Sequence, residues 1–159
     1  MNSMIMENGV TFKTLEKNIF SWVCEIGRQF TTEFLERYDR MLMEERDKKK
    51  YRHKGYRQTT IKTVYGEVTY RRAVCEVTQE DGSRHFVYLL DETLQLDHVG
   101  LISTNMAELL VKGVTELSYR ECAAKVSEMT GQTISAMGVW NVIQSLGENV
   151  CEEEAQLVE

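Results

Sequence analysis

Apolar residues recur at helical spacing through the first third of the chain, in steps of three or four. They are Phe12, Leu15, Ile19, Val23, Ile26, Phe30, Phe34, Tyr38 and Met41. This spacing places them on one face of a helix, and the sequence contains no proline that would interrupt it. We therefore predict one amphipathic helix over residues 11–49, about 60 Å long at 1.5 Å per residue. Packing on a following sheet would cover only part of that length, so the rest needs a partner, a second copy or another domain.

The periodicity changes to two in the middle of the chain. Polar and apolar residues alternate over residues 58–65, 68–78 and 85–90, with many β-branched side chains, as is typical of strands. Gly66-Glu67 separates the first two segments, and residues 80–83 (Glu-Asp-Gly-Ser) separate the last two. The Asp-Gly pair favours a type I′ hairpin turn. The pattern predicts a three-stranded antiparallel meander, which must pack on a helix to be stable.

Three further helices are predicted after residue 102, each opened by a serine cap. The caps are Ser103, Ser118 and Ser135. The predicted inward residues are Met106, Leu109, Leu110, Val114 and Leu117 in the first helix, Cys122, Ala123, Val126 and Met129 in the second, and Val139, Ile143 and Leu146 in the third. A glycine turn at Gly131 joins the second helix to the third, which is the layout of a helix-turn-helix.

The fold class predicted from these patterns is α+β, in three consecutive parts. Residues 1–55 form a long helical arm that ends in a basic run, residues 56–97 form the antiparallel sheet, and residues 98–159 form a helical region resembling a helix-turn-helix. A length of 159 residues suits one domain with an extended arm.

Charge is distributed unevenly along the chain. The net charge is −6, but residues 46–72 carry ten Lys/Arg and two acids, a net of +8, which leaves −14 for the remainder. A basic cluster of this kind is the usual footprint of a protein that binds phosphate backbones. On composition alone, a solvated helix end explains it equally well.

Several other functions find little support in the sequence. The four cysteines form no Cys-x-x-Cys pair, and with only three histidines a zinc site or another metal site is not indicated. No cysteine is linked to a nearby base, and no glycine-rich phosphate loop is present. The longest apolar run, residues 86–90, is far too short to span a membrane, and no signal peptide is visible. We expect a cytoplasmic protein with reduced thiols, no cofactor and no enzymatic activity of its own.

The last helix carries candidate DNA-reading residues on the face opposite its apolar side. These are Met137, Asn141 and Gln144, with Trp140 at the edge. Asn and Gln can pair bidentately with adenine, and Met or Trp can contact thymine methyl groups or sugars. Ser135 can cap the helix and also reach a phosphate. Since this face lacks Arg and Lys, affinity must come from basic residues elsewhere. The candidates are Lys48, Lys49, Lys50, Arg52 and Arg120. A purely structural helical hairpin is the alternative interpretation.

Four stretches of this chain occur in an order and spacing that belong to a known family. They are Gly66-Glu-Val-Thr-Tyr-Arg-Arg72, Tyr88-Leu-Leu-Asp-Glu92, Leu117-Ser-Tyr-Arg-Glu-Cys-Ala123 and Val139-Trp-Asn-Val-Ile-Gln144. Together they resemble the N-terminal half of ISLre-group insertion-sequence transposases, many of which are catalogued as an uncharacterised bacterial protein family. The resemblance covers residues 56–147. It implies a homo-oligomeric protein that binds double-stranded DNA at the terminal repeats of its own mobile element.

The resemblance also implies a division of labour. In such transposases a metal-dependent nuclease domain of the DDE kind cleaves and joins strands, and that domain would lie beyond Glu159. Asp91 and Glu92 are interpreted as turn or cap residues instead. The chain is then a truncated copy, an expressed fragment or a shortened relative. The leading hypothesis is a sequence-specific DNA-binding portion of a transposase without catalysis. The alternative is a non-enzymatic interaction module that oligomerises through the long helix.

Overall fold

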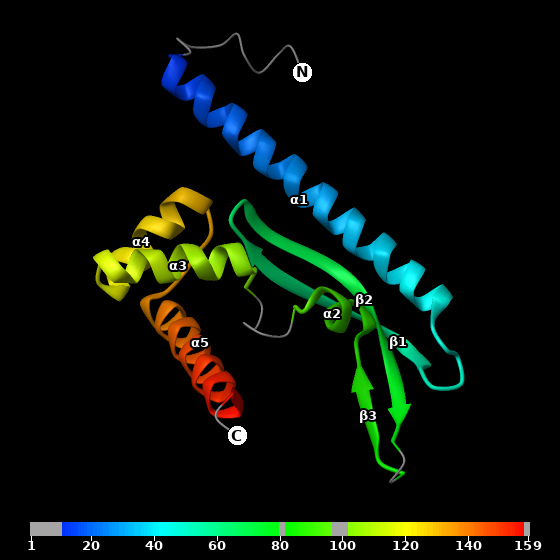
Figure 1. The fold of residues 1–159 in the computed structure, drawn as a ribbon. Coiled ribbons are helices and arrows are strands. Elements are labelled where there is room, and N and C mark those ends of the chain that lie inside the picture. The colour runs from blue at the N-terminus through cyan, green and yellow to red at the C-terminus, as the bar shows by residue number, and fades with distance from the viewer. Residues whose placement is uncertain (1–10, 80–81, 97–101, 158–159) are drawn as a thin grey trace, which may run out of the picture.

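The computed structural model describes residues 11–79, 82–96 and 102–157. Five helices and three strands lie along this part of the chain (Figure 1). They are α1 (Phe12–Glu45), β1 (Arg52–Thr63), β2 (Gly66–Thr78), β3 (Arg84–Val87), α2 (Leu89–Leu94), α3 (Thr104–Glu116), α4 (Tyr119–Thr130) and α5 (Ala136–Leu157). A long helix, a three-stranded antiparallel sheet of order β1-β2-β3 and several C-terminal helices confirm the predicted α+β class.

Helix α1 ends four residues before the predicted boundary at residue 49. Its start is as expected, because the Thr11 hydroxyl accepts a hydrogen bond from the Thr14 amide at 3.3 Å. At the other end the backbone of Arg46 is extended, and its guanidinium donates to the carbonyl oxygen of Tyr51 at 3.1 Å. The Asp47 carboxylate accepts from the amide nitrogen of Lys49 at 2.9 Å and stabilises a turn. The three consecutive lysines therefore lie in this turn, not on the helix.

The sheet differs from the prediction at both ends. Strand β1 begins six residues before the predicted start at residue 58. The added residues, 52–57, belong to the basic stretch over residues 46–72. The prediction that the third strand continues through residues 88–90 is wrong, because β3 ends at Val87 and α2 begins at Leu89. Leu90 is fully buried against the β1–β2 sheet in this helical conformation. A short apolar run does not by itself distinguish a strand from a helix turn. Residues 80–81 of the predicted Asp-Gly turn lie outside the described part of the chain.

Helix α1 covers the edge of the central strand, β2, that faces away from β1. β3 pairs only with residues 75–78 of β2, and among the described residues no strand pairs with residues 69–73 on that side. Three α1 side chains bind this edge instead. The contacts run from the Thr32 hydroxyl to the Thr69 carbonyl (3.2 Å), from the Arg71 amide to Glu36 (3.0 Å) and from the Ala73 amide to Asp39 (3.0 Å). The three α1 residues are spaced by four and three positions, which corresponds to a rise of about 4.5–6 Å along the helix. Two residues of a strand span roughly 6.6 Å, so the spacing of the side chains on α1 is close to that of the backbone groups on β2. An edge covered in this way is protected from pairing with other chains.

Helix α2 is fixed to the sheet by a buried ion pair. Asp91 lies in the first turn of α2 and pairs with the guanidinium of Arg72 on β2, and both side chains are largely buried. The same guanidinium stacks over the ring of Tyr88, 3.8 Å from its centroid. Asp91 and Glu92 lie in the first turn of α2, where their charge complements the helix dipole, but the N-cap residue is Tyr88 and no side chain caps this helix by a hydrogen bond. The pairing of Asp91 with Arg72 is a further structural role that the sequence pattern did not reveal.

Helices α3, α4 and α5 enclose a second core of their own. Its buried members are Met106, Ala107, Leu110, Cys122, Ala123, Val126, Val139 and Val142. The predicted serine caps are confirmed for α3 and α4, and Ser118 forms a reciprocal capping box with Glu121. Met129, predicted to face inward, is 53% exposed. That prediction is wrong because the chain after α4 folds back over Ser127, on the other side of the helix, where the Ile134 amide donates to the Ser127 hydroxyl at 2.9 Å.

Gly113 brings α3 and α4 into close contact. A Cβ added at this position would lie 2.5 Å from the sulfur of Cys122, closer than van der Waals packing permits. The Cys122 thiol is fully buried and points at the backbone of α3, 3.7 Å from the carbonyl oxygen of Leu110. Burial raises the pKa of this thiol above its usual range, so it stays protonated. Cys122 therefore acts as a packing residue.

Candidate nucleic-acid interface

The predicted reading residues lie together on the outer face of α5. Asn141 and Gln144 are exposed, as are Met137 and Trp140. The inner face of the same helix is held in the core by Val139, which is fully buried. The outer row is therefore accessible while the helix that carries it is fixed.

Ser135 caps α5 as predicted. Its hydroxyl accepts a hydrogen bond from the amide nitrogen of Gly138 at 3.0 Å. This leaves the exposed Ser135 at the positive end of the helix dipole. An anion such as a phosphate is favoured at such a position.

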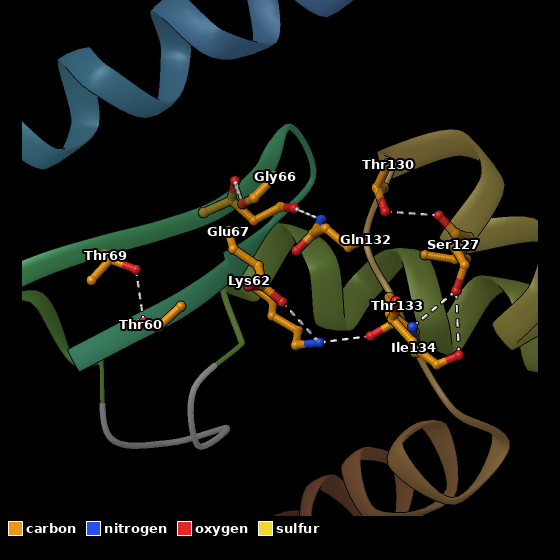
Figure 2. Close-up of polar contacts among 12 residues, drawn as sticks. Thr60, Lys62, Gly66, Glu67, Thr69, Ser127, Thr130, Gln132, Thr133 and Ile134 are labelled. Atoms are coloured by element: carbon orange, nitrogen blue, oxygen red, sulfur yellow. Dashed lines mark hydrogen bonds and ion pairs between the residues drawn. The ribbon is translucent and has the colours of Figure 1, made fainter.

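The segment between α4 and α5 is anchored to the end of the β1–β2 hairpin (Figure 2). The side-chain amide of the buried Gln132 donates to the Thr63 carbonyl at 2.6 Å. From the hairpin, the Lys62 ammonium donates to the Thr133 carbonyl at 2.7 Å and also pairs with Glu67 at 3.2 Å. These contacts fix the start of α5 relative to the sheet. Sequence spacing gave no sign of them, because the partners are about 70 residues apart.

The residues just before helix α3 also bind the β1–β2 hairpin. The amide nitrogen of Ser103 donates to the carbonyl oxygen of Lys62 at 2.9 Å, next to an isolated bridge between Lys62 and Ile102. Lys62 thus contacts the chain just before α3 through its backbone and the chain just before α5 through its side chain. Lys62 therefore joins the helical region to the sheet at two points, next to the contact between Gln132 and Thr63.

The predicted basic patch is smaller than its sequence charge suggests. Lys48, Lys49, Lys50 and Arg52 are all exposed in the turn after α1 and at the start of β1. Four other basic residues of the run are engaged within the fold. They are Arg46 with backbone carbonyls, Lys54 with Glu76 at 2.6 Å, Lys62 with Glu67 and Arg72 with Asp91. The hydrogen bond from Lys54 lowers the pKa of Glu76, so this carboxylate stays ionised and cancels nearby positive charge.

The structure does not bring the basic residues and the reading residues onto one surface of a single chain. The turn after α1 and helix α4 lie at opposite ends of the molecule in Figure 1, with the sheet between them. Arg120, in the first turn of α4 and exposed, belongs to the helical end. The expected composite interface is therefore two surfaces: the α5 face, defined as Ser135, Met137, Trp140, Asn141 and Gln144, and the basic turn, defined as Lys48, Lys49, Lys50 and Arg52.

Three other observations concern the described part of the chain. Among the described residues, no group of three or more His, Cys, Asp or Glu side chains is placed to hold a metal ion. An open hollow of about 650 Å³ lies beside the basic turn, lined by residues of the turn, β2, β3 and α2, including Lys50, His85 and Glu92. None of the helices in the described part is long and apolar enough to cross a bilayer.

Comparison with known proteins identifies the family of the chain. The model of the uncharacterised protein family UPF0236 matches residues 5–158, so the chain belongs to that family. Two UPF0236 proteins of Caldanaerobacter subterraneus subsp. tengcongensis are 27% and 26% identical to it over 145 residues. The alignments cover 91% of this chain but only 30% of each relative. The chain thus spans about a third of the length of these curated relatives. No solved structure matches it.

Proposed function

We propose that this member of the UPF0236 family is the DNA-binding N-terminal portion of a transposase, which recognises the ends of its own element in the cytoplasm. The observation that carries the proposal is the α5 face. Asn141 and Gln144 are exposed side by side on a helix whose opposite side is locked in a core. Amides so placed are suited to read adenine in the major groove.

The arrangement of α4 and α5 supports this role. Two consecutive helices joined by residues 131–135 share one core, as the two helices of a helix-turn-helix do. In that motif the second helix enters the major groove and the first crosses the backbone. Arg120, exposed at the start of α4, is then placed for a phosphate contact.

The family comparison supports a mobile element. The name of one relative combines eleven gene designations from one organism, and the name of another combines four. Many copies of one protein in one genome are what transposition produces. The relatives are also more than three times as long as the matched region, which leaves room outside it for the strand-cleaving domain that the resemblance to ISLre-group transposases implies.

A binding assay on the full chain tests the proposal. Fluorescence anisotropy would compare a duplex from the element terminus with a scrambled duplex of equal composition over a series of salt concentrations. We expect Asn141→Ala and Gln144→Ala each to lower the preference for the terminus by roughly 5- to 100-fold, since a bidentate pair contributes about 1–3 kcal/mol of discrimination. Asn105→Ala, which removes an exposed amide from α3, is the matched control. Equal affinity of the unchanged protein for both duplexes would refute sequence-specific binding.

A second candidate function is self-association through α1, as a non-enzymatic interaction module. The observation that favours it is the apolar row of α1, seven members of which remain exposed in the folded chain. Contiguous exposed apolar side chains are typical of interaction surfaces. Sedimentation velocity of the full chain between about 1 and 100 µM, a range that brackets micromolar association, tests it. A constant monomer mass across that range would remove this function.

A further inference from the structure

Most of the apolar row of α1 points away from the protein's own sheet, whereas Tyr38 is half-buried and packs against the sheet core. The side chains that α1 buries against the sheet are Leu35, Asp39 and Met43. At 100° per residue, the centre of the row lies roughly 175° around the helix axis from that buried side. Seven members of the row are between 43% and 79% exposed, and Phe12 is the most exposed. They are Phe12, Ile19, Val23, Ile26, Phe30, Phe34 and Met41. The row spans almost the whole helix, about 44 Å at 1.5 Å per residue.

The order of the row reads nearly the same in both directions. Consider two α1 helices that lie antiparallel with a two-fold axis between Ile26 and Gly27. Each residue then lies opposite a residue of the partner subunit, and the two residue numbers add up to 53. Three pairs join exposed residues: Phe12 with Met41, Ile19 with Phe34 and Val23 with Phe30. Leu15 meets Tyr38, and both are half-buried in the single chain. Only Ile26 lacks an apolar counterpart, because it meets Gly27 next to the axis. A surface that matches itself under a two-fold rotation is what an isologous dimer requires.

The charged residues closest to the row obey the same register. Glu16 and Arg37 lie within about 40° of the centre of the row, and the sum of their numbers is also 53. Both are exposed, and within the described part of the chain Arg37 makes only a long contact of 4.0 Å with Glu33. In the antiparallel register Glu16 would face Arg37 of the partner subunit, twice per dimer. A parallel pair in register would instead place Glu16 against Glu16 and Arg37 against Arg37.

We propose that two copies of this chain pair through α1 in the antiparallel register centred between Ile26 and Gly27. This inference rests on the second proposed function, self-association, and not on DNA binding. The two sheets lie on the outer sides of the helix pair, because each α1 turns its apolar row away from its own sheet. The occupant of the row is a second copy, since both the apolar order and the charges of the row are complementary to themselves.

This pairing bears on the separation of the two DNA-binding surfaces. With Phe12 facing Met41 of the partner subunit, the partner's basic turn lies just beyond the N-terminal end of α1. In Figure 1 that end of α1 lies at the same end of the molecule as α4. The dimer therefore carries the basic turn of one copy toward the helical region of the other. In a single chain the basic turn and the helical region lie at opposite ends of the molecule (Figure 1).

Charge reversal with rescue tests the register. Sedimentation equilibrium on the full chain would measure the dimer dissociation constant for Glu16→Arg, Arg37→Glu and the double variant. Each single reversal places like charges opposite each other at two symmetric sites. We expect it to weaken association by about tenfold. The double variant restores opposite charges and should return to within about twofold of the unchanged protein.

The matched control is Lys17→Glu, which makes the same change in net charge as Arg37→Glu at an exposed α1 position away from the row. It should leave the dissociation constant within about twofold. Circular dichroism would verify that every variant keeps its helix content. A monomeric chain at all concentrations would overturn both self-association and this register. A dimer in which the double variant is as weak as the singles would overturn the register alone.

Discussion

Helices α1 and α5 each bury one face and expose the other, and their exposed faces differ in chemistry. On α1 the exposed side is a row of Phe, Ile and Val, whereas the exposed side of α5 is led by Asn141 and Gln144. Water solvates the amides of α5 well but not the aromatic and aliphatic side chains of α1. The comparison suggests different partners: another protein surface for α1, and a hydrogen-bonding ligand such as a base edge for α5.

The buried faces of the two helices differ as well. α5 is held by apolar contacts around Val139. α1 combines apolar contacts of Leu35 and Met43 with a line of polar contacts along the β2 edge that ends at Asp39. Most of its apolar row takes no part in these contacts and stays exposed in the single chain.

The largest expected difference concerns stability. Val139→Asp places an unpaired carboxylate in the core of the helical region, and we expect it to lower the free energy of unfolding by more than about 3 kcal/mol. Phe30→Asp, on the exposed row of α1, should change it by less than about 0.5 kcal/mol in dilute solution. Urea denaturation at low protein concentration measures both. Comparable losses would mean that the α1 row is buried within the single chain.

The next largest effect concerns DNA affinity. Replacing Lys48, Lys49 and Lys50 by Gln together should weaken binding to every duplex by roughly 10- to 100-fold, and the slope of log affinity against log salt should become shallower by about 2.7. The preference for the element terminus should stay the same, because phosphate contacts carry no sequence information. Anisotropy titrations at several salt concentrations measure both quantities. If the preference for the element terminus changed while the salt dependence stayed the same, the basic turn would contact bases and not phosphates.

A smaller effect is expected at the anchor of α5. Gln132→Ala leaves the Thr63 carbonyl without its donor, and we expect a loss of about 1–2 kcal/mol of stability. Gln144→Ala, the same substitution at an exposed position, should be neutral within about 0.5 kcal/mol. Thermal denaturation compares the two. Equal melting temperatures would show that the hairpin anchor contributes nothing.

The smallest expected effect depends on pH. Burial, the main cause, raises the pKa of Asp39 despite the hydrogen bond from the Ala73 amide. The ionised form is therefore disfavoured in the folded state, and this penalty disappears as pH falls through the raised pKa toward the ordinary value of about 4. Asp39→Asn keeps an oxygen that can accept from Ala73, so it should raise the melting temperature at pH 7 and lose this advantage in acid. An advantage that grows in acid would reverse the sign of the shift.

The regular elements were largely predictable from the sequence, and their contacts were not. Helix caps such as Ser103 and Ser118 depend on residues a few positions away, which a local pattern contains. The strand predicted through Leu90 failed because burial against a distant sheet, and not local alternation, decides its conformation.

The candidate site was predictable only in part. The outward direction of Asn141 and Gln144 follows from helical periodicity, and the structure places both on the exposed face. The neutralisation of Lys54 by Glu76 and the anchoring of Gln132 to Thr63 depend on partners 22 and 69 residues away. No local pattern encodes such pairs, so the extent of the basic patch and the position of α5 required the fold.

Photo-crosslinking from α5 is the sharpest test of whether this helix reads DNA. A benzoylphenylalanine at position 137, where Met137 is 65% exposed, would be irradiated in a complex of the full chain with a duplex from the element terminus. The account predicts a crosslink to defined bases of the terminus, and no crosslink from the same probe at position 105 on α3. Crosslinking from position 105 alone, or equal crosslinking of position 137 to scrambled DNA, would contradict it.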